Sequence, residues 1–268
     1  MKVARSTYYS ILNHKASGRE IENNTLKSKI FKIYCDNRKV YGCIKITRIL
    51  RDNGYPKLSV NRVSRLMKQL GIRSVTIRKF KNYRNKQNEH SELKNLVNQN
   101  FSAQKPNRIW LSDITYIHTV KHGWTYLASV LDVCTRKIVG YSYGRKMDRS
   151  LVISALTKAW QNQNYPNNVI LHSDRGSQYT SSEYIAAAER MGFRLSYSKK
   201  GCPFDNAPME SFHSVLKKEE VYLKHYSSFD EAKIRLFDYI NGFYNRNRVH
   251  SSINYLSPVQ FEKSLLQS

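Results

Sequence analysis

Hydrophobic residues in the first quarter of the chain recur with the three- and four-residue spacing of helices. One apolar stripe runs through residues 25–37, a second through 43–55 and a third through 59–71. The third segment begins at Ser59, which suits a helix N-cap, and ends at Gly71. The sequence therefore predicts three short helices in this region. Their apolar positions are Leu26, Ile30, Ile33 and Tyr34, then Ile46, Ile49 and Leu50, then Val63, Leu66, Met67 and Leu70.

From about residue 108 the pattern changes to that of strands. Runs of β-branched and aromatic residues predict an antiparallel meander at 108–119, 125–134 and 137–144. Helices and strands then alternate, and Thr180 and Glu183 have the spacing of a capping box. This order predicts an α/β fold with a ribonuclease H-like mixed sheet, preceded by a small helical domain. The later elements are a helix at 148–163, a strand at 168–173, a helix at 181–192, a strand at 194–198 and a helix near 205–220.

Charge indicates the class of partner. The chain carries 45 basic and 20 acidic residues, a formal net charge of +25. Such an excess attracts polyanions, and counterion release favours phosphate contacts, so nucleic acid is the expected partner. A solvated basic surface is the alternative, and a membrane partner is not expected because no basic amphipathic helix has a long apolar face. The first 105 residues hold 24 basic and 6 acidic residues, so this excess is concentrated there.

Two basic segments are candidates for DNA contact. The third predicted helix carries basic residues opposite its apolar stripe, as the groove-reading helix of a helix-turn-helix motif does. A simple bundle with a solvated basic face would look the same. The segment 73–88 follows with six basic residues and no acidic one, which suits a linker that tracks phosphates. The candidate DNA-binding residues are Arg62, Arg65 and Lys68 in the helix and Arg78, Lys79 and Lys81 in the linker.

Targeting and cysteine signals are weak. No apolar run approaches the roughly 18 residues that span a bilayer, and the amino terminus lacks a signal-peptide pattern, so we expect a cytoplasmic protein. Cys35, Cys43, Cys134 and Cys202 lie far apart and are expected to be reduced. A zinc site made from His14, Cys35 and Cys43 would match no zinc-finger spacing.

Three acidic residues that are distant in sequence are expected to share one pocket. Asp113 lies in the first predicted strand, Asp174 directly after the fourth, and Glu210 in the last helix of the core. In a mixed sheet of this order the first and fourth strands are neighbours, and the helix carries Glu210 across the two aspartates. Taken singly, Asp174 could start a turn and Glu210 could be a first-turn partner of the helix dipole.

A shared pocket of carboxylates implies a metal. Like charges repel, and the three groups stay ionised together only if a cation is bound. Oxygen ligands with room for water and phosphate favour Mg²⁺ or Mn²⁺. Two such ions, about 3.5 to 4 Å apart, stabilise the attacking and leaving oxygens of an in-line phosphoryl displacement. We therefore predict two ions per site, held by Asp113, Asp174 and Glu210.

The segments "WLSDITYI", "HSDRGSQYTS" and "GCPFDNAPMESFHSVLKKE" resemble the catalytic core of DDE transposases, specifically the OrfB-type transposases of the bacterial Insertion Sequence 3 family, relatives of retroviral integrases. The resemblance runs from about residue 44 to residue 262. It implies an enzyme that hydrolyses a phosphodiester at the end of an insertion sequence and joins the freed 3′ hydroxyl to a second DNA site. It also implies the three acids as catalytic residues, a homo-oligomer on DNA at the nucleoid, and an upstream-frame protein as fusion or partner.

Further positions take expectations from this resemblance. Lys217, seven residues after Glu210, matches the family's basic residue that contacts DNA, with a solvated lysine as the alternative. Asn206 is expected to cap the last helix and touch substrate, and His172 either to orient Asp174 or to be hydrogen-bonded in the fold. Gln178 and Tyr179 are expected to shape the loop after Asp174, with packing in the core as the alternative. In the tail element Tyr244, Asn245, Arg248 and His250, we expect Tyr244 to brace the core and count Arg248 among the DNA contacts.

The expected organisation has four parts. They are a helical DNA-binding domain with its opening segment (1–72), a basic linker (73–104), the catalytic core (105–225) and a helical C-terminal extension (226–268). Two other functions remain open. A non-enzymatic DNA-binding regulator would share the charge and the helices but would have no reason to retain all three acids. A ribonuclease H-like nuclease would hydrolyse DNA without joining it.

Overall fold

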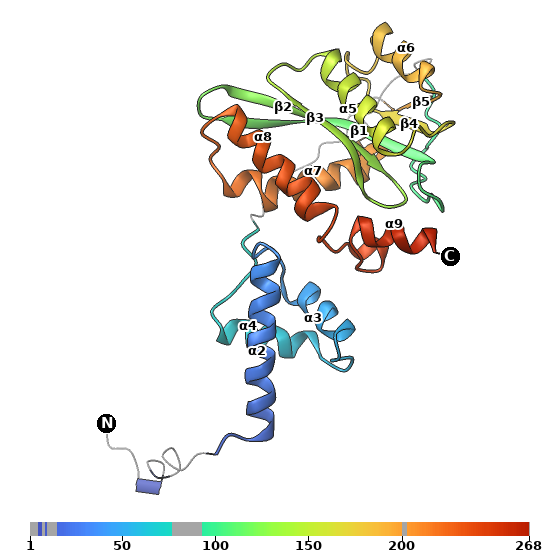
Figure 1. Cartoon of the computed structure of the whole chain (residues 1–268). Helices are drawn as coiled ribbons and strands as arrows, with labels where there is room; N and C mark the ends of the chain where they lie inside the picture. The colour runs from blue at the N-terminus through green and yellow to red at the C-terminus, as the bar shows by residue number, and fades with distance from the viewer. Residues whose placement is uncertain (1–4, 7–8, 10–14, 77–92, 200–202, 268) are drawn as a thin grey trace. The chain divides into compact units, whose positions relative to one another are not determined.

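The chain forms two compact units, Met1–Val75 and Thr76–Ser268 (Figure 1). The computed structural model describes residues 5–6, 9, 15–76, 93–199 and 203–267. The predictions made for His14, Arg78, Lys79, Lys81 and Cys202 lie outside the described residues.

The first unit contains the three predicted helices, α2 (Gly18–Asp36), α3 (Cys43–Asp52) and α4 (Val60–Gln69). α2 begins before its apolar stripe, at a capping box in which Ser17 and Glu20 each accept a hydrogen bond from the other's backbone N–H. The stripe alone predicts a start near residue 25, so the prediction missed this cap. The helices close around one small core, whose members include Leu26, Ile30, Tyr34, Ile46, Leu50, Val63, Leu66 and Met67.

The second unit is built on a five-stranded mixed sheet of order β3-β2-β1-β4-β5. β1 (Ile109–Thr119), β2 (Gly123–Asp132) and β3 (Ile138–Gly144) form the antiparallel meander. β4 (Ile170–Ser173) and β5 (Arg194–Tyr197) follow in parallel on the other side of β1. The ribonuclease H-like prediction is confirmed, including the expectation that the first and fourth strands are neighbours.

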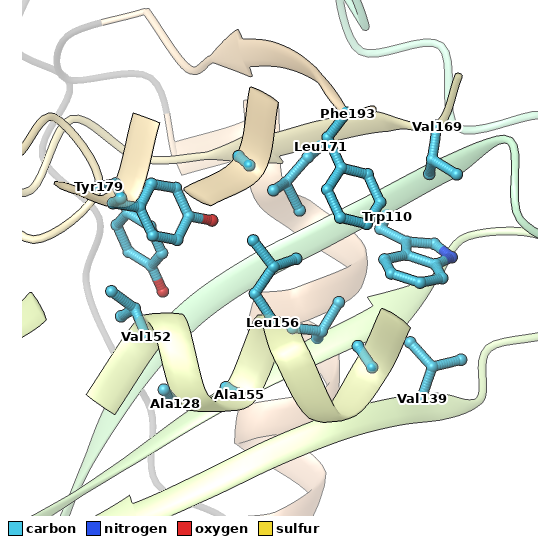
Figure 2. Packing of buried hydrophobic residues seen from close by; sticks show 14 of the residues in the cluster. Trp110, Ala128, Val139, Val152, Ala155, Leu156, Val169, Leu171, Tyr179 and Phe193 are labelled. Atoms are coloured by element: carbon cyan, nitrogen blue, oxygen red, sulfur yellow. The ribbon is translucent and has the colours of Figure 1, made fainter. Parts of the chain in front are cut away.

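The main core lies between the sheet and the helices α5 (Arg149–Asn162) and α6 (Ser182–Arg190), as Figure 2 shows. Trp110 of β1 is fully buried there, and its ring centroid lies 5.2 Å from that of Phe193. Burying each large apolar side chain contributes roughly 1.5 to 3 kcal/mol, so this face holds much of the unit's stability. β3 and α5 come so close that a Cβ at Gly140 would lie 2.4 Å from the backbone nitrogen of Ala159.

α6 begins one residue later than the predicted capping box. Ser181 is its N-cap and accepts a hydrogen bond from the backbone N–H of Tyr184, whereas the Thr180 hydroxyl donates to the carbonyl of Gly176. The capping box predicted for Thr180 and Glu183 is therefore wrong. The predicted end at Gly192 is confirmed, because this residue has a φ of +77°, which glycine adopts without strain.

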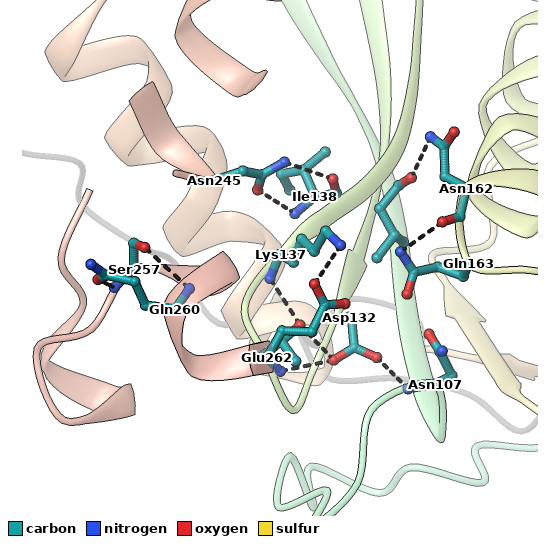
Figure 3. A network of polar contacts seen from close by, with 12 residues as sticks. Asn107, Asp132, Lys137, Ile138, Asn162, Gln163, Asn245, Ser257, Gln260 and Glu262 are labelled. Atoms are coloured by element: carbon teal, nitrogen blue, oxygen red, sulfur yellow. Dashed lines mark hydrogen bonds and ion pairs between the residues drawn. The ribbon is translucent and has the colours of Figure 1, made fainter. Parts of the chain in front are cut away.

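The opposite face of the sheet is covered by α7 (Ala207–Glu219), and the chain after it braces the core. The later elements are η2 (Val221–Leu223), α8 (Phe229–Phe237), η3 (Asp238–Tyr244), η4 (Ser251–Ile253) and α9 (Pro258–Leu266). Figure 3 shows how this tail holds β3: the amide of Asn245 bonds both to the N–H and to the carbonyl of Ile138. Lys137 Nζ also lies 2.6 Å from Glu262 Oε2. No helix of the described residues is long and apolar enough to cross a membrane.

Candidate active site

Asp113 and Asp174 leave the sheet from adjacent backbone positions. β1 and β4 are parallel, and their register pairs Ser112 with Ser173. Asp113 and Asp174 each follow their serine by one residue, so the two aspartates start from neighbouring backbone positions. Neighbouring strands lie about 4.8 Å apart. Two acids that are 61 positions apart by their numbers are thus brought together at the carboxyl end of β4.

Fixed hydrogen bonds and mutual repulsion act on these carboxylates. Asp113 Oδ1 accepts from the N–H of Ile114 at 2.8 Å, and Asp174 Oδ1 accepts from the N–H of Gly176 at 2.9 Å. Desolvation raises the pKa of Asp174, the Gly176 bond lowers it, and the charge of Asp113 raises it again, with a net rise. A bound cation would remove the repulsion that contributes to this rise.

α7 brings Glu210 towards the aspartates. His213 lies one turn after Glu210 on the same helix face, and its Nδ1 is 3.4 Å from Asp113 Oδ2. Glu210 is half-buried, about 5 Å along the helix axis from the side chain that contacts Asp113. Sequence reasoning missed His213, although its i, i+3 spacing from Glu210 was a signal that it faces the same site.

The donor set fits a hard cation. In the part of the chain that the structure describes, no three His, Cys, Asp or Glu side chains lie close enough together to hold a metal ion. The three carboxylates would nevertheless offer only oxygen ligands, and Asp174, although partly desolvated, keeps enough solvent exposure to leave room for water and phosphate. Binding a metal ion would require the three carboxylates to come closer together than they lie in this structure.

Comparisons with known proteins decide the family. Integrase core domain models match residues 103–203 and 210–266, and a helix-turn-helix-like domain model matches 21–80. The transposase for insertion sequence element IS904 of Lactococcus lactis is 38% identical over 94% of this chain and 99% of its own length. Transposase InsF for insertion sequence IS3A of Escherichia coli is 37% identical over 99% of this chain and 92% of its own length.

The chain belongs to the transposases of the Insertion Sequence 3 family. It is therefore a DDE transposase, a polynucleotidyl transferase that acts on DNA, and the alternative of a non-enzymatic regulator is not favoured. The fold also resembles that of a chain in the structure of the simian T-cell lymphotropic virus intasome in complex with PP2A regulatory subunit B56 gamma, with a TM-score of 0.50 at 15% identity over 87% of this chain and 74% of that chain.

In this transposase Lys217 lies on the same face of α7 as Glu210. It follows Glu210 by two helical turns and lines a cavity together with Tyr116 and Trp124. Asn206 occupies the N-cap position of α7, but its buried side chain makes no capping hydrogen bond. The expectation that Asn206 caps the helix through its side chain is therefore wrong, and Pro208 in the first turn supplies the start signal instead.

Two of the predicted DNA contacts are engaged within the fold. The guanidinium of Arg248 is buried and bonds Glu219 through Nε and Nη2, at 2.9 Å each. Arg62 bonds Glu22 at 2.8 Å and also Asn23, which ties α4 to α2. A phosphate would have to displace a carboxylate at both positions, so the structure does not support Arg62 and Arg248 as DNA contacts. Arg65 and Lys68 are exposed on α4.

The residues around Asp174 hold its loop. His172 is fully buried between the hydroxyls of Ser196 and Ser198, and burial lowers its pKa to about 4. We expected His172 either to orient Asp174 or to be hydrogen-bonded in the fold, and the structure shows the second role. Tyr179 is buried and its hydroxyl accepts from Ser112, while Gln178 donates to the carbonyl of Met147.

Proposed function

We propose that Asp113, Asp174 and Glu210 are the catalytic residues of this transposase and that together they hold Mg²⁺ or Mn²⁺, two ions per site. The observation that carries the proposal is that the β1–β4 register places Asp113 and Asp174 at neighbouring backbone positions, while His213 of α7 contacts Asp113. When bound, the ions supply Lewis-acid stabilisation of charge on the phosphate oxygens.

The side chains of this site bind and orient the DNA strand that reacts. The carboxylates would hold the ions against the scissile phosphate, and Lys217 contacts the DNA two turns further along α7. The buried side chain of Asn206 is not placed to touch DNA. Water attacks phosphorus at the end of the element, and the bond to the 3′ oxygen breaks and leaves a 3′ hydroxyl. This hydroxyl then attacks a phosphodiester of the target, so one such bond forms as one breaks. Arg65 and Lys68 contribute phosphate contacts from α4, and a multimer brings two ends together.

The test is cleavage and joining of duplexes that carry the ends of the element, in the presence of Mg²⁺. Asp113→Asn and Glu210→Gln should each lower the rate at least a thousandfold, on the scale at which removal of essential catalytic groups acts, while DNA binding is retained. Asp230→Asn, an exposed aspartate in the first turn of α8, is the matched control and should react normally. Normal cleavage by either catalytic variant would refute the assignment, and cleavage without joining would indicate a nuclease.

A further inference from the structure

Exposed aromatic rings gather at the end of the β1–β2 hairpin. Tyr116 and Trp124 are 47% and 60% exposed, and their ring centroids lie 6.4 Å apart in an edge-to-face arrangement. His118 is the cross-strand partner of Trp124, with ring centroids 5.2 Å apart. Large apolar side chains that are exposed singly are ordinary, but a cluster of them marks a binding surface.

These rings line a cavity of about 540 Å³, which we call the aromatic groove. Its other wall comes from the end of α7 and the segment after it, which runs beside the end of β1 through a bridge between Thr119 and Tyr226. The residues that give the groove its chemistry are Tyr116, His118, Trp124, Lys217, Tyr222 and Lys224. Among the described residues, two lysines and no acidic side chain line it, so its charge suits a polyanion that carries flat apolar rings.

The groove lies a short distance along the chain from the carboxylates. Tyr116 follows Asp113 by three residues along β1, about 10 Å, and projects from the other face of the strand. Lys217 is therefore the lining residue that connects the groove with the helix face of Glu210. Lys217 follows Glu210 by seven residues along α7, again about 10 Å. At about 3.4 Å of rise per nucleotide in a duplex, a strand whose phosphate sits at the acids reaches the groove within about three nucleotides.

We propose that the aromatic groove binds unpaired nucleobases of the DNA strand that passes through the active site, stacked on Trp124 and Tyr116, with Lys217 and Lys224 beside its phosphates. The proposal rests on the proposed function, because that function supplies the strand. Opening the last base pairs of the element end would let the scissile phosphate descend to the carboxylates. Stacking on aromatic rings offsets part of the free energy lost when those bases leave the duplex.

Two probes separate the bases from the backbone. One is a duplex with a short tail of unpaired thymidines, and the other carries the same tail built from abasic nucleotides. Binding is measured by anisotropy without Mg²⁺, so that no cleavage occurs. Trp124→Ala should weaken binding of the thymidine-tailed duplex about tenfold and leave the abasic probe unchanged. Trp124→Phe should restore most of the loss.

Phe237→Ala is the matched control, because Phe237 in α8 is 60% exposed, as Trp124 is, and does not line the groove. Fluorescence gives a second readout: of the three tryptophans, Trp110 is buried and Trp160 half-buried, so quenching by the thymidine tail should vanish in Trp124→Phe.

Three results would overturn the proposal. They are equal loss of affinity for both probes in Trp124→Ala, unchanged affinity for both, and a change of oligomeric state in place of the tail preference, which would assign the groove to a second copy of the chain. Asp113→Asn should retain the tail preference, so the stacking site and the carboxylate site can fail independently.

Discussion

At the scale of single residues, basic side chains in this transposase serve two opposite purposes. Arg65 and Lys68 face solvent, whereas Arg62 and Arg248 are paired with acids. In the sequence these four look alike, because the partners of the paired ones lie 40 and 29 positions away. A helical stripe predicts which face is polar, but it does not reveal which cation on that face meets a distant carboxylate.

The pair of Arg248 and Glu219 is expected to be a major support of the C-terminal extension. Burial alone would lower the pKa of Arg248, but the charge and hydrogen bonds of Glu219 outweigh this and raise it. Tyr239 donates a third hydrogen bond, to Glu219 Oε2 at 2.9 Å. Glu219→Gln leaves a buried cation without its counter-charge and should lower the free energy of unfolding by about 3 to 5 kcal/mol.

Denaturant unfolding of the full chain measures this effect. The double variant Glu219→Leu with Arg248→Met removes both charges and should recover much of the loss, because apolar replacement of a buried pair is often neutral. Unfolding of Glu219→Gln at the wild-type denaturant midpoint would show that the pair is not structurally important.

At the scale of elements, the sequence predicted order and type well and boundaries less well. The sheet order followed from the chain order of the strands, since right-handed crossovers leave few ways to close a mixed sheet. The start of α6 differed because the neighbouring hydroxyls of Thr180 and Ser181 could each cap it, and only geometry decides which one does. The start of α2 differed because its first turns are mostly polar and precede the apolar stripe. The sequence predicted that Glu210 and Lys217 share one face of α7, but it did not single out His213, which lies between them on that face.

α4 is the element expected to supply non-specific DNA affinity. Removing one side chain that binds a phosphate should reduce the slope of log affinity against log salt by about 0.9 for a duplex. Arg65→Ala with Lys68→Ala should therefore lower the slope by about two and weaken binding of any duplex at low salt. Lys158→Ala, an exposed lysine on α5, is the control, measured by the same salt titration. An unchanged slope in the α4 variant would remove this helix from the DNA interface.

At the scale of the whole molecule, we propose that the two units divide the work between DNA recognition and chemistry. The first unit holds a small core and an exposed basic helix, whereas the second holds the sheet that brings the acids together. The sequence could predict this division because charge and hydrophobic period change near the same place. It could not predict the aromatic groove, since Tyr116 and Trp124 read as ordinary strand residues until β1 and β2 are paired beside α7.

The most direct test of the central claim is a crystal structure of the transposase bound to DNA and Mn²⁺, with anomalous scattering used to locate the ions. We predict anomalous peaks about 2.0 to 2.2 Å from carboxylate oxygens of Asp113, Asp174 and Glu210, all within one pocket. Peaks that contact none of these carboxylates, or ions bound while the three side chains point to separate surfaces, would contradict the account.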